Sequence, residues 1–169
     1  TGTELEGMLQ GRVRGEVVGR DHPDYAQARR VDNGSIDRHP ELIVRCADAG
    51  DVVAALGAGR ETGLDIAVRG GGHSVPGFGT VDDGLVIDLG AIRIVRVDQG
   101  GRVADVGGGA TLGDLDHASH AFGLATPTGV LSTTGVGGLT LGGGQGYLTR
   151  KHGLTIDNLV SADVVLADG

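Results

Sequence analysis

Glycine is the residue that most limits what this chain can fold into, because it accounts for 34 of the 169 residues. That is about one residue in five, roughly three times the average usage in soluble proteins. The glycines lack a three-residue period, which excludes a collagen-like helix, and they gather near residues 70, 107, 137 and 143. Each one costs backbone entropy on folding. A single cluster would indicate a tight turn, whereas four favour close approach of the backbone to a large ligand.

Residues 42 to 69 have the pattern of a β-α-β unit. Residues 42–46 are a short apolar run that predicts a strand, and residues 64–69 alternate like a second strand. Asp48 and Gly63 are typical N-cap and C-cap residues, so a helix is expected between them. The stretch RGGGHSVPGFGT, residues 69–80, follows the carboxyl end of the second strand, where ligands bind in open α/β sheets.

Weaker patterns predict the other elements. A helix is expected up to about Gly11, an irregular loop over 20–40, and a turn at 150–153. Thr111 caps a helix expected to run to about Phe122. Residues 125–147 are expected to be a functional loop, because structureless runs of that length are otherwise uncommon. Further strands are expected over residues 85–88, 92–97, 103–106 and 159–166, with a hairpin turn at 99–101.

Charge and composition exclude several classes of function. The net charge of −8 disfavours binding to nucleic acid and to anionic membranes. A single cysteine, Cys46, excludes an internal disulfide and a cysteine-based zinc site. No membrane-spanning or signal-like apolar run is present, so we expect a soluble, cytoplasmic protein. His117 and His120 could pair on one helix face, but no third ligand accompanies them, and no metal site is expected.

The glycine clusters do not fit the common nucleotide-binding motifs. A dinucleotide fingerprint needs a helix directly after its glycines, and Pro76, Gly77 and Gly79 interrupt any helix here. A P-loop needs a Gly-Lys pair, which the sequence lacks. Consecutive glycine amides can still converge on an anion. His73 lies in the loop whose glycines allow the backbone the most conformational freedom. Its setting therefore favours a functional role over that of an ordinary surface histidine.

Several motifs in order resemble one known family. The chain from about Leu42 to Gly169 resembles the flavin domain of the berberine-bridge-enzyme-like oxidases, which are vanillyl-alcohol-oxidase (p-cresol methylhydroxylase, or PCMH, type) flavoproteins. The matching motifs are RGGGHS (69–74), GLVIDL (84–89), VGGGA (106–110), TTGVGGLTLGGGQG (133–146) and RKHGLTIDN (150–158).

The resemblance implies an α+β, PCMH-type FAD-binding domain of two α/β lobes with the cofactor between them. Residues 1–100 would form the first lobe with the pyrophosphate loop, and residues 101–169 the second, ending before a substrate domain. His73 would be joined covalently to the 8α methyl carbon of the flavin. The cofactor-binding residues so implied are Arg69, Gly70, Gly71, Gly72, His73, Ser74, Gly77, Gly109, Ala110, Thr111, Thr133, Thr134, Gly135, Gly137, Gly138, Gly142, Gly146 and Val165.

One position departs from the family pattern. Many members attach the flavin a second time through a cysteine, and Leu131 stands in that place here. The resemblance therefore implies a single link through His73. It also implies an oxidase that takes hydride from a small-molecule C–H next to oxygen or nitrogen and passes electrons to O₂. A flavin dehydrogenase, a flavin carrier and a plain α/β domain whose glycines only make turns remain as alternatives. No catalytic base is identified in this segment.

Overall fold

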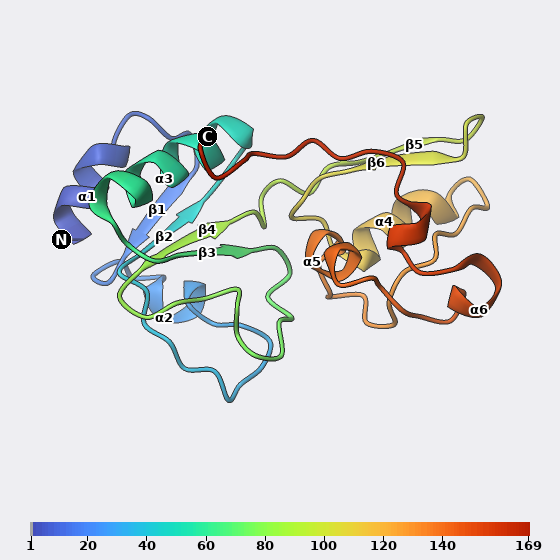
Figure 1. The fold of residues 1–169 in the computed structure, drawn as a ribbon, viewed down its shortest axis with the longest axis horizontal. Helices are drawn as coiled ribbons and strands as arrows, with labels where there is room; N and C mark the ends of the chain where they lie inside the picture. Colours follow the sequence, from blue (N-terminus) through green and yellow to red (C-terminus); the bar gives the residue numbers. More distant parts are fainter. Residues whose placement is uncertain (1) are drawn as a thin grey trace.

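The computed structural model describes residues 2–169, which form two groups of elements side by side (Figure 1). The first group is built on a four-stranded sheet of order β1-β2-β4-β3, and the second on a two-stranded sheet, β5-β6. The elements are α1 (Gly2–Leu9), β1 (Glu16–Gly19), α2 (Tyr25–Ala28), β2 (Leu42–Arg45), α3 (Ala49–Thr62), β3 (Ile66–Arg69), β4 (Leu85–Asp88), β5 (Val95–Asp98), β6 (Val103–Val106), α4 (Leu112–His120), α5 (Val136–Leu141), α6 (Thr149–His152) and a 3₁₀ turn (Ile156–Asn158).

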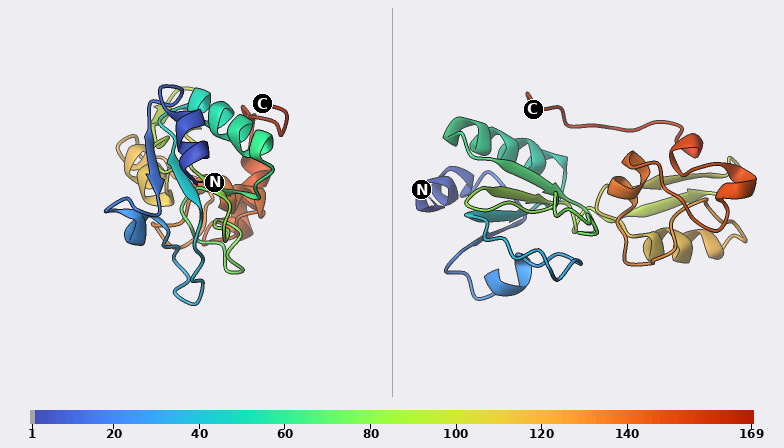
Figure 2. Two further views of the ribbon diagram at one scale, coloured as in Figure 1. Left: turned by 90° about the vertical axis from the view of Figure 1, so that its left-hand side faces the viewer. Right: turned by 60° about the horizontal axis from the view of Figure 1, so that its bottom comes forward.

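Both faces of the first sheet are buried. Alternate residues of its central strands pack against α1 and α3 on one side and against α2 on the other (Figure 2). This arrangement explains why β2 and β4 are continuous apolar runs, as is typical of parallel strands covered on two faces. The residues facing α1 and α3 are Leu42, Val44, Leu85 and Ile87, and those facing α2 are Ile43, Ala67 and Val86.

The predicted β-α-β unit is present, with one difference in its pairing. The Asp48 side chain accepts a hydrogen bond from the Asp51 amide at the start of α3, and Gly63 ends the helix at φ 69°. However, β2 and β3 do not pair with each other, because both are parallel neighbours of β4. Hydrophobic periodicity predicts strands but carries no information about which strand enters the gap between two others.

The hairpin of the second group is confirmed, with a shifted first strand. β5 begins at Val95 rather than at residue 92, because the Ile92 amide donates to Leu89 O in a turn. The predicted lobe boundary after residue 100 falls in the turn between β5 and β6, which pair in one sheet. The hairpin is therefore not divided there, and both of its strands contact α4.

Several short elements differ from the sequence predictions. The expected loops contain α2 and α5, and β1 was not predicted; these elements have at most six residues, and α5 contains two adjacent glycines that are poor helix formers. Residues 159–166 were expected to be a strand, but they form no ladder with any other described residue. This segment runs extended back towards α3 (Figure 1). No helix among residues 2–169 combines the length and apolar character needed to cross a bilayer.

Candidate functional site

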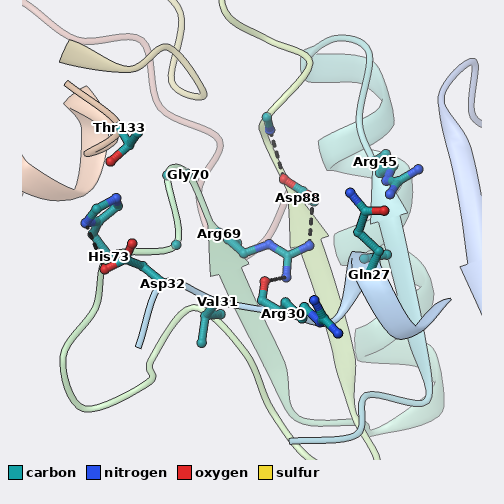
Figure 3. Close-up of a pocket in the computed structure, with 14 residues that line it drawn as sticks. Gln27, Arg30, Val31, Asp32, Arg45, Arg69, Gly70, His73, Asp88 and Thr133 are labelled. Carbon is teal, nitrogen blue, oxygen red and sulfur yellow. Dashed lines mark hydrogen bonds and ion pairs between the residues drawn. The ribbon is translucent and has the colours of Figure 1, made fainter. Parts of the chain in front are cut away.

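A cavity of about 430 Å³ lies at the carboxyl ends of the parallel strands. The last residues of β2, β3 and β4, which are Arg45, Arg69 and Asp88, line it together with residues 70–73. Thr133 reaches it from the second group of elements (Figure 3). The cavity is thus at the edge where open α/β sheets bind ligands, and both groups of elements contribute to it.

The backbone amides of Gly70 to Ser74 are available for a ligand. None of them donates a hydrogen bond to another atom of residues 2–169, and all of these residues are half-buried. Buried amides are nearly always paired with protein, water or ligand. A run of amides left without a protein partner beside a cavity is a binding surface for an anion.

His73 lies at one end of this cavity, close to Thr133 (Figure 3). Its side chain is 15% exposed, and its Nδ1 is 3.4 Å from Oδ2 of Asp32. The imidazole is therefore enclosed on most sides, and one of its nitrogens faces a carboxylate.

Arg69 is held within the protein. Its Nη2 donates to Oδ2 of Asp88 at 2.7 Å, and the two side chains are only 7% and 16% exposed. Its Nη1 donates to the carbonyl of Arg30 at 3.4 Å. Asp88 also accepts from the Gly90 amide at 2.9 Å. Because Asp88 already neutralises the guanidinium, Arg69 helps to shape the cavity, and the groups left to contact an anion there include the unpaired amides of residues 70–73. Arg30 and Arg45 also line the cavity.

The glycine motifs of the two groups touch each other. A Cβ atom added to Gly71 would lie 2.8 Å from the Cα of Gly135, and one added to Gly137 would lie 3.0 Å from the Gly108 carbonyl oxygen. The Val136 amide donates to the carbonyl of Ala110 at 2.8 Å. Glycines at Gly71 and Gly135 thus let three separate loops meet backbone to backbone beside the cavity.

The predicted site residues divide into three sets. Arg69, Gly70, Gly71, Gly72, His73 and Thr133 line the cavity. Gly109, Ala110, Thr111, Thr134, Gly135 and Gly137 lie in the loops that meet beside it. The others lie outside its lining: Ser74 and Gly77 in the next turn, Gly138 and Gly142 in or at the end of α5, Gly146 against Thr128, and Val165 in the extended C-terminal segment.

Comparison with known families agrees with this arrangement. A family model described as "FAD binding domain" matches residues 40–169. The chain belongs to this family of FAD-binding domains. The predicted α+β, PCMH-type fold is therefore confirmed, and so is the resemblance to flavin-linked oxidases.

Relatives of this FAD-binding domain are longer enzymes. The (R)-6-hydroxynicotine oxidase of Paenarthrobacter nicotinovorans is 40% identical over 157 residues, which are 93% of this chain and 34% of that protein. The crystal structure of 6-hydroxy-D-nicotine oxidase from Arthrobacter nicotinovorans superposes with a TM-score of 0.91 at 39% identity, covering 92% of this chain and 34% of that one. Phl p 4, a grass pollen allergen with glucose dehydrogenase activity, superposes with a TM-score of 0.86 at 32% identity, covering 97% of this chain and 36% of that one. The chain spans about a third of the length of these relatives.

Several residues that line the cavity of this FAD-binding domain were not predicted from the sequence. Arg45 and Asp88 end predicted parallel strands, so the rule that places ligands at such ends could have found them. Gln27, Arg30, Val31 and Asp32 come from α2 and the loop after it, which have no periodic pattern. Nothing in the sequence indicates that this loop folds beside residues 70–73.

The residues present fit FAD with one covalent link at most. Cys46, the only cysteine, is fully buried in the first core. Burial raises the pKa of its thiol to about 12, so it stays protonated at neutral pH. Leu131, which stands at the place where the resemblance implies a second linking cysteine in many family members, is 57% exposed.

The part of the chain that the structure describes contains one group of three potential metal ligands, Glu16, His22 and Asp24. The guanidinium of Arg45 already forms an ion pair with Glu16 inside this group. His117 and His120 do not belong to it. The group lies outside the cavity lining and carries no argument for a metal.

Proposed function

We propose that the complete protein is an FAD-dependent oxidase of small molecules and that this chain holds the cofactor between its two groups of elements. When bound, FAD would supply the redox chemistry: it takes a hydride from a substrate C–H next to nitrogen or oxygen and passes the electrons to O₂. The observation that carries the proposal is the run of unpaired amides from Gly70 to Ser74 beside a cavity that ends at His73.

The chain's own residues would act as a rigid holder. The amides of residues 70–74 would bind the negatively charged diphosphate, which an acidic protein with a net charge of −8 must otherwise repel. His73 would bond to the flavin ring, and the loops around Gly109 and Gly135 would enclose the cofactor from the second group. Because Cys46 is buried and protonated, the link through His73 would be the only one.

The substrate class follows from chemistry that the relatives share. The names 6-hydroxynicotine oxidase and glucose dehydrogenase denote substrates with C–H bonds next to nitrogen and oxygen respectively. A dehydrogenase is the second candidate, because one relative with the same fold is described as such. The two candidates differ only in the electron acceptor.

Spectra of the complete protein test the proposal. We expect flavin absorbance in the purified protein and yellow colour that stays on the polypeptide after acid denaturation. A His73→Ala variant should bind FAD but release it in acid. After anaerobic reduction by substrate, rapid reoxidation in air supports the oxidase, and slow reoxidation favours the dehydrogenase. Protein that shows no flavin bands after FAD is supplied contradicts both.

A further inference from the structure

We propose that Asn33 is a site of spontaneous deamidation, and that this change loosens the loop that holds the glycine-rich segment of the cofactor site. Gly34 follows Asn33. Glycine hinders attack on a preceding asparagine side chain least, because it has no Cβ atom. The chain has one other asparagine, Asn158, and the bulky Leu159 follows it. The effect on FAD rests on the proposed function, whereas the chemistry at Asn33 does not.

The loop that contains Asn33 is hydrogen bonded to the glycine-rich segment. The Asp32 amide donates to the carbonyl of Gly72, which lines the cavity, at 3.1 Å. Nδ2 of Asn33 donates to the carbonyl of Val75, in the next turn, at 2.8 Å. The Asn33 side chain is therefore one of the contacts that keep the two segments together beside the cavity.

A charged side chain holds the same loop further along. Nη1 of Arg38 donates to the carbonyls of Gly77 and Thr80, at 3.2 and 2.8 Å. We call residues 32–38 the Asp32 loop. Since the Arg38 contacts do not involve Asn33, loss of the Asn33 contact would free the part of the segment nearest the cavity and leave the rest anchored.

The surroundings of Asn33 favour attack by the next amide nitrogen. The Gly34 amide donates no hydrogen bond to another atom of residues 2–169, and Gly34 is exposed. A Cβ atom added to Gly34 would meet nothing within 4 Å. Oδ1 of Asn33 accepts from the Ser35 amide at 3.1 Å. Such a donor stabilises the negative charge that develops on this oxygen when Cγ is attacked.

Deamidation needs only water as a co-reactant. The Gly34 nitrogen attacks Cγ of Asn33, its proton passes to the departing side-chain nitrogen, and the Cγ–Nδ2 bond breaks to release ammonia. The product is a five-membered succinimide ring. Water then opens this ring at one of its two carbonyls and yields aspartate or isoaspartate, whose main chain runs through Cβ and Cγ. No electrons are transferred.

Both products weaken the contact with the glycine-rich segment. A carboxylate at position 33 has no proton to donate to the Val75 carbonyl, so the hydrogen bond is lost and two oxygen atoms face each other. The new negative charge also lies next to Asp32, which lines the cavity (Figure 3). It therefore repels the diphosphate proposed to bind there.

Bound FAD is expected to slow the reaction. The Val75 carbonyl holds Nδ2 in place, so the nitrogen leaves readily only when the Asp32 loop separates from the glycine-rich segment. A ligand that binds only the closed arrangement lowers the fraction of open molecules by mass action. With FAD at about ten times its dissociation constant, the deamidation rate should fall about tenfold.

Peptide mass spectrometry of the complete protein tests the site. A His73→Ala background keeps FAD binding reversible, and samples are incubated at mildly alkaline pH with and without FAD. We expect Asn33 to be converted, more slowly with FAD, and Asn158 to stay intact, since its Nδ2 donates to the carbonyls of His152 and Leu154. Gly34→Ala should keep Asn33 as the amide and bind FAD with unchanged affinity.

Two further variants test the effect on FAD. Asn33→Asp represents one product, and its FAD affinity should fall roughly tenfold. Its thermal unfolding midpoint should change little, because Arg38 still anchors the Asp32 loop. Ser35→Asp adds the same charge at an exposed neighbour and keeps the Asn33 donor, so it should lose less affinity. Equal losses in the two variants would overturn the role of the Asn33 hydrogen bond.

The outcomes separate this proposal from the proposed function. If Asn33 is converted no faster than Asn158, the modification site is wrong. If the rate is the same with and without FAD, or if Asn33→Asp binds FAD as tightly as its parent, the link between Asn33 and the cofactor site is wrong. If the protein binds no FAD but Asn33 is still converted, the proposed function and the effect on FAD are wrong, and the modification site stands.

Discussion

Gly71 and Gly135, which belong to different groups of elements, meet backbone to backbone. A Cβ atom on Gly71 would lie 2.8 Å from the Cα of Gly135 and closer still to its nitrogen, and a Cβ atom on Gly135 would lie 3.0 Å from the Cα of Gly71. Real Cβ atoms do not approach backbone this closely, so no other residue fits at either position without moving the loops apart. The contact joins the RGGGHS loop to the TTGVGG loop at the edge of the cavity.

Gly71→Ala is expected to separate these loops. Forcing an extra methyl group into a filled contact costs about 1–3 kcal/mol, and here it also moves two walls of the cofactor site. We expect a lower thermal unfolding midpoint and weaker FAD binding, measured by titration in a His73→Ala background so that no covalent link forms. Gly57→Ala is the matched control, because a Cβ atom at this α3 position meets nothing within 4 Å. Equal behaviour of the two variants would contradict the prediction.

Gly138→Ala tests whether glycine at this position of the second group serves the fold or the contact with the cofactor. A Cβ atom there also meets no protein atom within 4 Å, and alanine favours a helix such as α5 over glycine by about 0.5–1 kcal/mol. We therefore expect unchanged or slightly higher stability. If Gly138 contacts the cofactor, as the family resemblance implies, FAD affinity should fall at least about tenfold, which corresponds to about 1.4 kcal/mol. Full affinity would remove Gly138 from the cofactor site.

The sequence predicted the parts of the fold that depend on local signals. The strands over 85–88 and 103–106, the Asp48 and Gly63 caps and the Thr111 cap are all confirmed. Each depends on residues close together in the chain: the strands on the pattern of apolar residues, and the caps on local backbone conformation or one side-chain hydrogen bond. The motif order also predicted the family correctly, because several glycine runs at fixed spacing are far more specific than any one of them.

Contacts between distant segments could not be predicted in the same way. The insertion of β4 between β2 and β3, and the packing of the Asp32 loop on residues 72–80, arise from tertiary contacts. The glycine clusters were explained as close approach to a ligand, but the structure shows that Gly71 and Gly135 first approach each other. A pattern of small residues indicates that something comes close without identifying what it is.

Among the carboxylates of the first group, Asp51 is the one whose removal we expect to lower the stability of the protein most. Asp51 is only 2% exposed. Its carboxylate accepts hydrogen bonds from the amides of Arg14, Gly15 and Ala47 at 2.8 to 2.9 Å. Asp51→Ala leaves these donors without their acceptor, at about 1–3 kcal/mol for each buried group that water cannot reach. We expect a clear fall in the denaturation midpoint, whereas Asp65→Ala, at an exposed position, should change it little.

The same carboxylate gives stability a definite pH dependence. Burial alone would raise the pKa of Asp51, but the hydrogen bonds from the Arg14, Ala47 and Gly15 amides outweigh it, and the pKa is lowered overall. A lowered pKa means that the unfolded chain binds the proton more readily, so this stabilisation is complete above the ordinary value and is lost on acidification. The wild type should lose stability more steeply than Asp51→Ala below about pH 4. Parallel curves would contradict this assignment.

The capping box of α4 is also expected to lose its stabilisation in acid. Oδ1 of Asp114 accepts from Arg93 at 2.6 Å, and Oδ2 accepts from the amide and hydroxyl of Thr111 at 2.8 and 2.9 Å. Arg93 first, and then Thr111, lower the pKa of Asp114 to about 2 from its ordinary 3.8. The stabilisation is therefore complete above about pH 4 and is lost as the pH falls through about 2.

Asp114→Asn tests the box at neutral pH. Caps of this kind contribute about 1 kcal/mol, and we discount the ion pair because Arg93 is largely exposed. Hydrogen exchange should therefore be faster at the amides of the first turn of α4, while α3 keeps its protection. Asp116→Asn, on the exposed side of the same helix, is the matched control and should leave exchange unchanged. Since Thr111 was predicted to contact FAD, faster exchange without any loss of FAD affinity would assign Thr111 to the cap alone.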